Sequence, residues 1–223
     1  MARMPSAHHP LSLDDAVELT RTGDIWIFRG RSAADRAIQT LTNSPVNHVG
    51  MAVVLDDLPP LMWHAELGKS LRDMWTGDFH RGAQLHDLRE AVVQWQSRYG
   101  QRAWLRQLTP DVSTGQEDAL LRAIARLNGV AFPSTARLAA RWLAGRDAHV
   151  SRRERRDRAS RPELAYCAEI VAATMIDMDL LDPGFAISSY DPGTFWSGDR
   201  LPLTPGWRLG GELAVARASA PTP

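Results

Sequence analysis

Three side chains in this sequence have types that together could perform nucleophilic catalysis at a carbonyl group. Cys167 is the single cysteine of the chain, and His48 and His64 lie far upstream, each inside an apolar segment. A thiol attacks a carbonyl as its thiolate, and a neighbouring imidazole can accept the thiol proton and later protonate the leaving group. A second polar group fixes the tautomer and tilt of that imidazole. These residues are therefore candidates for a nucleophile, a base and an orienting group.

Other roles for the same three residues stay open. A cysteine among apolar residues commonly packs as a small hydrophobic side chain, and a histidine in a strand commonly packs in the core. Cysteine and histidine are also zinc ligands, but no Cys-x-x-Cys or His-x-x-x-His spacing accompanies them here. We therefore expect no metal site formed by His48, His64 and Cys167, and no cofactor.

The two histidines are predicted to share one face of an antiparallel sheet. Short apolar runs predict strands at residues 25–28, 46–55, 61–67, 84–88, 103–108 and 207–215. Side chains alternate between the two faces along a strand, and His48 and His64 are an even number of residues apart. A hairpin that turns at 56–60 can therefore place both on the same face. His80 and His86 flank a weaker strand signal and are expected at the surface.

The nucleophile candidate lies near the start of a predicted helix. Helices are predicted at residues 13–20 (with Ser12 as N-cap), 32–41, 114–127, 134–144 and 163–176. A helix N-terminus and a nearby imidazolium both lower the pKa of a thiol, so we expect Cys167 as the thiolate of an ion pair. The backbone N–H of Cys167 is then a natural donor to an oxyanion.

The composition is that of an ordinary globular domain. The chain has 223 residues, and 26 Lys and Arg residues balance 26 Asp and Glu residues, which argues against a globally cationic nucleic-acid binder. No apolar run is long enough for a transmembrane segment, and the first ten residues lack the apolar core of a secretory signal. With one cysteine and no disulfide framework, these features predict a cytoplasmic protein.

One domain is predicted, with short additions at both ends. The expected parts are an N-terminal extension with a short helix at 1–22, the main domain at 23–217, and a disordered tail at 218–223. Within the main domain, residues 145–161 carry many arginines and few large apolar residues, which predicts an exposed insertion.

Four short motifs occur in an order that resembles a known enzyme family. They are Gly23-Asp24-Ile25, His48-Val49-Gly50, His64-Ala65 and Tyr166-Cys167-Ala168-Glu169-Ile170-Val171. This set resembles the circularly permuted papain-like amidases of the NlpC superfamily, the YaeF/YiiX branch. Ala168 in place of the family's Ser, and Phe132 in place of a Tyr, depart from its pattern.

The resemblance implies an α+β fold of the permuted papain-like (NlpC) type, in which an antiparallel sheet packs against helices and the nucleophile lies at a helix N-terminus. It implies Cys167 as nucleophile, His48 as base and His64 as the third polar residue. Glu66, two residues after His64 on the same strand face, is the alternative third residue.

The implied activity is that of a cysteine-dependent hydrolase or acyltransferase. The enzyme would cleave an amide or ester bond of a small-molecule, peptide or lipid-linked acyl substrate through a thioester intermediate. Two alternatives stay open. One is a catalytically idle binding module on the same fold. The other is nucleic-acid binding through the Arg run at 152–158, although Glu154 and Asp157 interrupt that run and no aromatic residue accompanies it.

Overall fold

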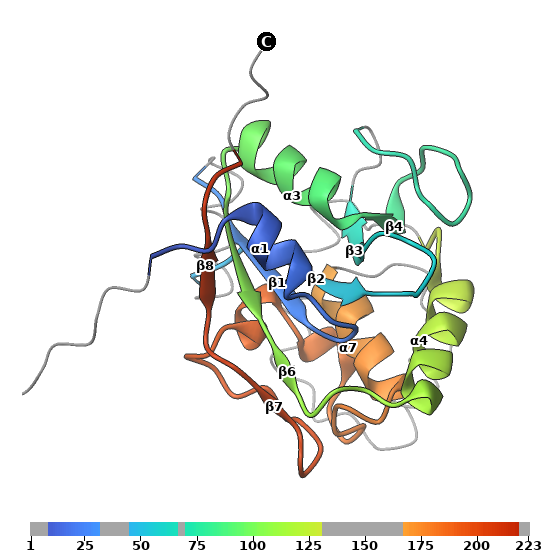
Figure 1. The fold of residues 1–223 in the computed structure, drawn as a ribbon. Helices are drawn as coiled ribbons and strands as arrows, with labels where there is room; N and C mark the ends of the chain where they lie inside the picture. The colour runs from blue at the N-terminus through green and yellow to red at the C-terminus, as the bar shows by residue number, and fades with distance from the viewer. Residues whose placement is uncertain (1–8, 32–44, 67–69, 131–166, 219–223) are drawn as a thin grey trace, which may run out of the picture.

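An antiparallel sheet forms the centre of the molecule. The computed structural model describes residues 9–31, 45–66, 70–130 and 167–218. In this part of the chain a six-stranded sheet has the order β4-β3-β2-β1-β5-β8 (Figure 1). Its strands are β1 (Ile25–Arg29), β2 (His48–Val53), β3 (Leu61–Glu66), β4 (Gly82–Asp87), β5 (Arg102–Arg106) and β8 (Leu213–Val215). The α+β class predicted from the sequence is therefore observed.

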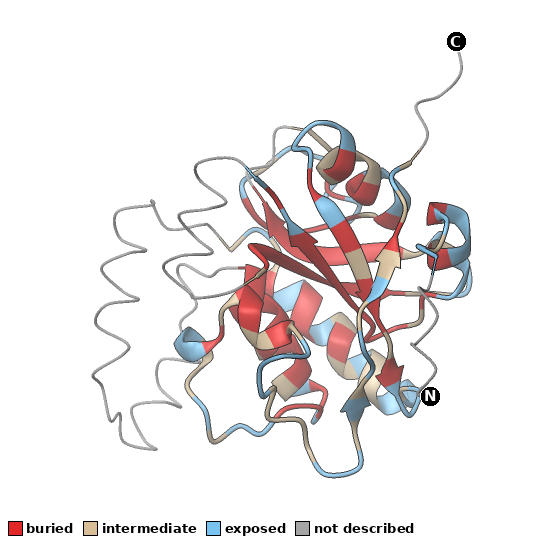
Figure 2. Cartoon of the chain, turned by 90° about the vertical axis from the view of Figure 1, so that its left-hand side faces the viewer, coloured by how far each residue is buried: buried red, intermediate tan, exposed pale blue. Residues whose placement is uncertain are grey.

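Helices cover both faces of this sheet. α1 (Leu13–Glu18) and α3 (Leu88–Ser97) lie on one face, and α7 (Cys167–Asp177) lies on the other with α4 (Thr114–Leu127) packed against it (Figure 1). The central strands β2 and β3 are buried throughout (Figure 2). The remaining elements are a two-stranded sheet of β6 (Leu108–Thr109) with β7 (Arg208–Leu209), and the 3-10 helices η1 (Ile187–Ser189) and η2 (Pro192–Phe195).

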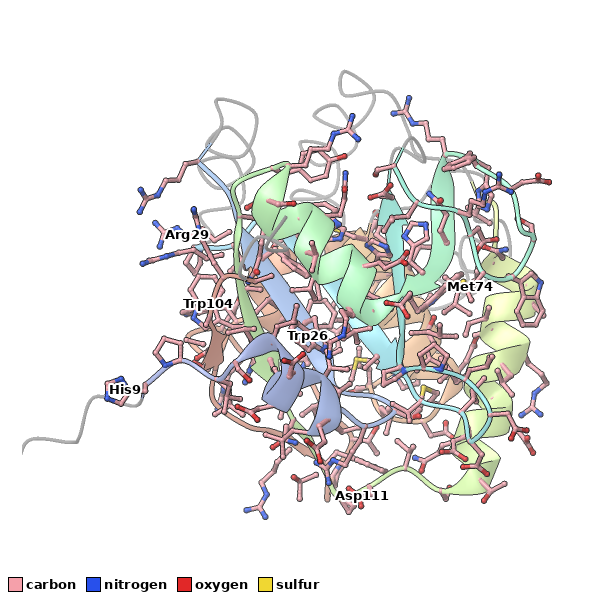
Figure 3. The ribbon with its side chains drawn as sticks, turned by 45° about the horizontal axis from the view of Figure 1, so that its top comes forward. His9, Trp26, Arg29, Met74, Trp104 and Asp111 are labelled. Carbon is pink, nitrogen blue, oxygen red and sulfur yellow. The ribbon has the colours of Figure 1, made fainter. Side chains whose placement is uncertain are left out.

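Alternation along the strands sorts the core into two clusters. Trp26 of β1, labelled in Figure 3, packs with Phe28, Ala52 and Met62 on the face that α1 and α3 cover. The intervening strand residues pack with α4 and α7 on the other face, among them Ile27, Val49, Met51, Trp63 and Leu85. Since side chains alternate, neighbouring positions of β2 therefore belong to different layers of the protein.

Most predicted elements of the described part are present, with shifted ends. Ser12 caps α1 as expected, through a bond from the Asp15 amide to its side chain, and the helix at 114–127 is observed as α4. The closing strand at 207–215 is split into β7 and β8. The predicted helices at 32–41 and 134–144, the insertion at 145–161 with its Arg run, Phe132 and Tyr166 lie outside the described residues.

One helix is not predicted from the sequence. α3 follows β4 without a break: the side chain of Asp87, the last residue of β4, accepts a hydrogen bond from the Glu90 amide and so caps the helix. Its buried positions Leu88, Ala91 and Val92 have the spacing of a helix face.

Both ends of the described chain pack on the sheet. Leu11 bridges to Val215, and Leu13 and Ala16 of α1 pack in the core cluster that contains Trp26 and Val215. At the other end the Ala218 amide donates to Gln96 Oε1 of α3. Hydrogen bonding to α3 thus extends to Ala218, the first residue of the expected tail. Among the described residues, no helix has the length and apolar character that crossing a membrane requires.

Candidate active site

His48 and His64 form a buried hydrogen-bonded pair. His48 begins β2 and His64 lies in the middle of β3, and the distance from His48 Nε2 to His64 Nδ1 is 3.0 Å. The even spacing and the hairpin therefore place the two rings on one face, as the sequence predicts. Both side chains are nearly inaccessible to solvent.

Gly50 makes the approach of the two strands possible at this point. A Cβ atom at Gly50 would lie 2.8 Å from Met62 Cγ and 3.3 Å from His64 Cβ. A residue with a side chain at position 50 would therefore have to displace the Met62 and His64 side chains, close to where they leave the β3 backbone. The glycine of the His-Val-Gly motif thus leaves room for His64 beside β2.

A third histidine and a glutamine extend the pair. The distance from His64 Nε2 to His86 Nδ1 is 2.8 Å, and His86 Nε2 lies 3.2 Å from Gln84 Oε1. We call His48, His64, His86 and Gln84 the histidine network. The prediction that His86 lies at the surface is wrong. β4 pairs with β3 so that His86 lies opposite Met62, on the face that α3 covers, and the ring is fully buried.

The network fixes the tautomer of every ring. Gln84 Nε2 donates to the carbonyl oxygens of Glu66 and Gly82, so Gln84 Oε1 must face His86. His86 Nε2–H then donates to that oxygen, which leaves His86 Nδ1 as the acceptor for His64 Nε2–H. By the same logic His64 Nδ1 accepts from His48 Nε2–H. The Nδ1 atom of His48 therefore carries a lone pair, as a general base requires.

Trp95 of α3 holds the His48 ring in place. The two rings stack with centroids 3.8 Å apart and an angle of 12° between their planes. Phe28 of β1 lies on the same face, with its ring centroid 5.7 Å from that of His48. Neither aromatic residue was identified as part of the site from sequence, because the helix that presents Trp95 was not predicted.

Cys167 lies in the opposite layer of the core. It is the first residue of α7, is 4% exposed, and packs in the cluster that contains Val49 and Trp63. Trp63 Nε1–H also donates to Thr174 Oγ1 of α7, which ties this helix to that face of the sheet. The structure thus brings His48 and His64 together, and it shows no hydrogen bond from the Cys167 thiol to either ring.

The thiol nevertheless lies next to the strand that carries His48. The backbone of Val49, the residue after His48, hydrogen-bonds to the Cys167 sulfur, as do the amides of Ala168 and of Cys167 itself. Each of these bonds acts to lower the pKa of the thiol. Amides alternate in direction along a strand, and since Ala52 N–H bonds to β1, that of Val49 points toward β3. The recorded β2–β3 register covers only Met51–Val53 against Leu61–Trp63. Beyond that register, His48–Gly50 still pairs with β1 and His64–Glu66 still pairs with β4.

The resting charges differ from the expected ion pair. Burial raises the pKa of the Cys167 thiol to about 11, and the charge of Glu169 acts in the same direction. Burial lowers the pKa of His48 to about 3 and, together with the neighbouring His86 and His48, holds that of His64 well below its usual value. The expectation of a thiolate–imidazolium pair is corrected: at neutral pH both groups are uncharged.

Glu66 ends β3 close to the network. Its carboxylate accepts a hydrogen bond of 3.1 Å from Ser70 Oγ, and one carboxylate oxygen lies within 4.8 Å of ring nitrogens of His64 and His86. His64, and not Glu66, makes the recorded hydrogen bond to His48. The geometry therefore favours His64 as the group that orients His48.

The buried neutral rings make stability depend on pH. The folded-state pKa values of His48 and His86 are about 3 and about 4, below the 6.5 of a free imidazole. Between these values the unfolded chain binds protons that the folded chain does not. The free energy of unfolding should therefore fall as pH falls below about 6.5, by up to about 1.4 kcal/mol per pH unit for each histidine of the network.

Asp24 opposes part of this effect, because its burial raises its pKa to about 6 and the folded state keeps that proton longer. Burial also raises the pKa values of Asp177 and Asp191, which act in the same direction as Asp24, so the histidine contribution is read from a variant. Urea unfolding at several pH values between 7.5 and 4.5 measures the slope in wild type and in His86→Gln. The variant should lose less stability toward acid, by about 1.4 kcal/mol per pH unit, and an unchanged slope would contradict a neutral His86 ring.

Comparison with known proteins finds similarity among solved structures. No family model matches the chain, and no curated protein matches it. Among solved structures, the chain is similar to the metalloprotein YiiX from Escherichia coli O157:H7, with 17% identity and a TM-score of 0.47, over 86% of this chain and 97% of that one. A likeness of this degree implies nothing about the chemistry of this chain.

Proposed function

We propose that this protein is a cysteine-dependent hydrolase or acyltransferase that acts on amide or ester bonds. The observation that carries the proposal is the tautomer of His48. The histidine network leaves His48 Nδ1 as a lone pair, one residue along β2 from the amide that acts on the Cys167 sulfur. The candidate base and the backbone partner of the candidate nucleophile are therefore consecutive residues of β2.

The neutral resting state implies general-base activation. His48 Nδ1 takes the proton from Cys167 Sγ as the sulfur attacks the carbonyl carbon, which forms a tetrahedral oxyanion. The amides of Cys167 and Ala168 at the start of α7 are the donors available to that oxyanion. His48 then returns the proton to the leaving amine or alcohol, and the thioester on Cys167 is released by water or another acceptor.

The reaction requires the Cys167 thiol and the His48 ring to come into contact. In the described conformation they lie in the two layers on either side of β2, and the half-strand His48–Gly50 lies outside the recorded register with β3. Catalytic contacts are commonly long in a free enzyme and shorten when substrate binds.

His64 positions His48 in this proposal, and its replacement should reduce activity without abolishing it. The variant His64→Ala should slow acyl transfer by on the order of tenfold to a thousandfold, because orientation contributes less than proton transfer and nucleophile formation. Glu66→Gln should change the rate little. Rates of acyl-donor consumption for the two variants decide between the residues, and a larger loss for Glu66→Gln would show that Glu66 is the third group.

A catalytically idle binding module is the second candidate, and specific observations favour it. Cys167 is a buried, uncharged thiol that packs with Val49 and Trp63, whereas the His48 ring contacts Phe28 and Trp95 on the other face of the sheet. In such a module the thiol is a packing residue, and no acyl donor modifies it at a rate that depends on His48. Dependence of Cys167 acylation on His48 therefore separates the two functions.

A further inference from the structure

Three buried side chains on one face of β3 and β4 have the donor set of a transition-metal site. One ligand atom each from His64, Glu66 and His86 lies within 4.8 Å of the other two, and all three residues are buried. We propose that these residues bind one divalent cation of the zinc class. This set differs from the His48, His64 and Cys167 set considered from sequence, because Cys167 lies in the opposite core layer.

The donors fit such an ion in kind and in spacing. Two imidazole nitrogens and one carboxylate oxygen suit zinc, whose bonds of about 2.0–2.2 Å place neighbouring ligand atoms roughly 3.4 Å apart. His64 Nε2 and His86 Nδ1 already face each other at 2.8 Å, so they need only separate slightly. A Glu66 carboxylate oxygen lies within 4.8 Å of both nitrogens, and rotation of this side chain can adjust its position. Three protein ligands leave a fourth position open for water or a small ligand.

The surroundings would hold both imidazole ligands in the required tautomer. A metal-bound histidine normally donates its other ring N–H to an acceptor, and loss of that partner typically weakens metal binding about 10–100-fold. His86 Nε2–H donates to Gln84 Oε1, and Gln84 is itself anchored on two carbonyl oxygens. His64 Nδ1 faces His48 Nε2 at 3.0 Å, which can accept from it. The acceptor for His86 is thus in place, and the acceptor for His64 forms when the His48 proton moves from Nε2 to Nδ1.

Metal binding would also reverse the direction of the hydrogen bond between His48 and His64. The ion takes the lone pair of His64 Nε2, so the His64 proton must lie on Nδ1 and point to His48 Nε2. His48 then carries its own proton on Nδ1, and no proton is gained or lost overall. The proton on His48 Nδ1 occupies the lone pair that the proposed base uses, so zinc should inhibit acyl transfer reversibly. The inhibition rests on the proposed function, whereas binding of the ion does not.

The test uses the untagged full-length protein and Zn²⁺ alone, followed by native mass spectrometry and titration calorimetry. We expect one Zn²⁺ per chain, bound about tenfold or more weakly by His86→Gln, Glu66→Gln and Gln84→Leu. The variants His80→Gln and Cys167→Ala should bind as wild type does. His80 is a matched histidine that bonds to Asp73 outside the cluster. Absence of binding, equal binding by the three site variants, or loss of binding in Cys167→Ala would overturn the assignment.

A wild-type measurement guards against variants that fail to fold. Histidine ¹⁵N spectra should show that Zn²⁺ shifts the signals of His64 Nε2 and His86 Nδ1 to those of metal-bound nitrogens. Unchanged ring signals at saturating zinc would overturn the site. Zinc that shifts these signals but leaves acyl transfer unaltered would support the metal site and contradict His48 as the base, which separates the two proposals.

Discussion

Replacing Cys167 with alanine should abolish acyl transfer, with a rate loss on the order of 10⁴-fold or more, because removal of a covalent nucleophile leaves only substrate binding and oxyanion stabilisation. Cys167 is the single cysteine of the chain, so no second thiol can replace it. The measurement is turnover of an acyl donor that the wild type accepts. Cys167→Ser, which keeps the side-chain shape, should be nearly as inactive, since a hydroxyl is far less acidic than a thiol.

The structural control for this pair is stability. The alanine variant removes one buried sulfur atom from a site that is 4% exposed, and such small deletions typically cost about 1 kcal/mol. Both variants should therefore remain folded by circular dichroism and urea unfolding. A folded Cys167→Ala protein with turnover within tenfold of wild type would exclude the thioester mechanism and favour a different nucleophile.

Replacing His48 should cause the second largest loss, on the order of 10³- to 10⁴-fold, because activation of the thiol and protonation of the leaving group fail together. His48→Gln is the sharper variant. Its amide can still bond to His64 and pack against Trp95, whereas alanine would leave a cavity between Phe28 and Trp95. Both variants should have the same low turnover if proton transfer is the function of His48.

His80→Gln is the matched control for His48→Gln, since it changes a histidine whose hydrogen bond goes to Asp73 and not to a ring of the network. Its turnover should equal that of wild type. If His48→Gln retains more than about a tenth of wild-type activity, His48 is a packing residue and not the base.

The parts of the site that follow local rules could be predicted from sequence. Strand alternation and the even spacing of His48 and His64 place both rings on one face, and the turn between them is short. His86 depends instead on the register of β4 against β3, across a connection that begins after Glu66. No periodicity within either strand specifies that register, so the burial of His86 and the role of Gln84 were not predictable.

The layer in which Cys167 lies is a second feature that the sequence could not predict. β2 is buried on both faces, and a strand of this kind has no polar side to indicate which layer a later helix covers. The sequence therefore predicts that Cys167 faces the sheet, which it does, but not that α7 packs on the face opposite to His48. The neutral charge state follows from that burial, whereas rules for a helix N-terminus alone predict a thiolate.

The most direct test is intact mass spectrometry of the wild-type protein after exposure to a panel of amide, thioester and ester acyl donors. The account predicts an acyl adduct on Cys167 with at least one donor, formed on the order of 10³-fold more slowly in His48→Gln and absent from Cys167→Ala. The adduct mass would identify the acyl group. Equal adduct formation in wild type and His48→Gln, or an adduct that persists in Cys167→Ala, would contradict the proposal.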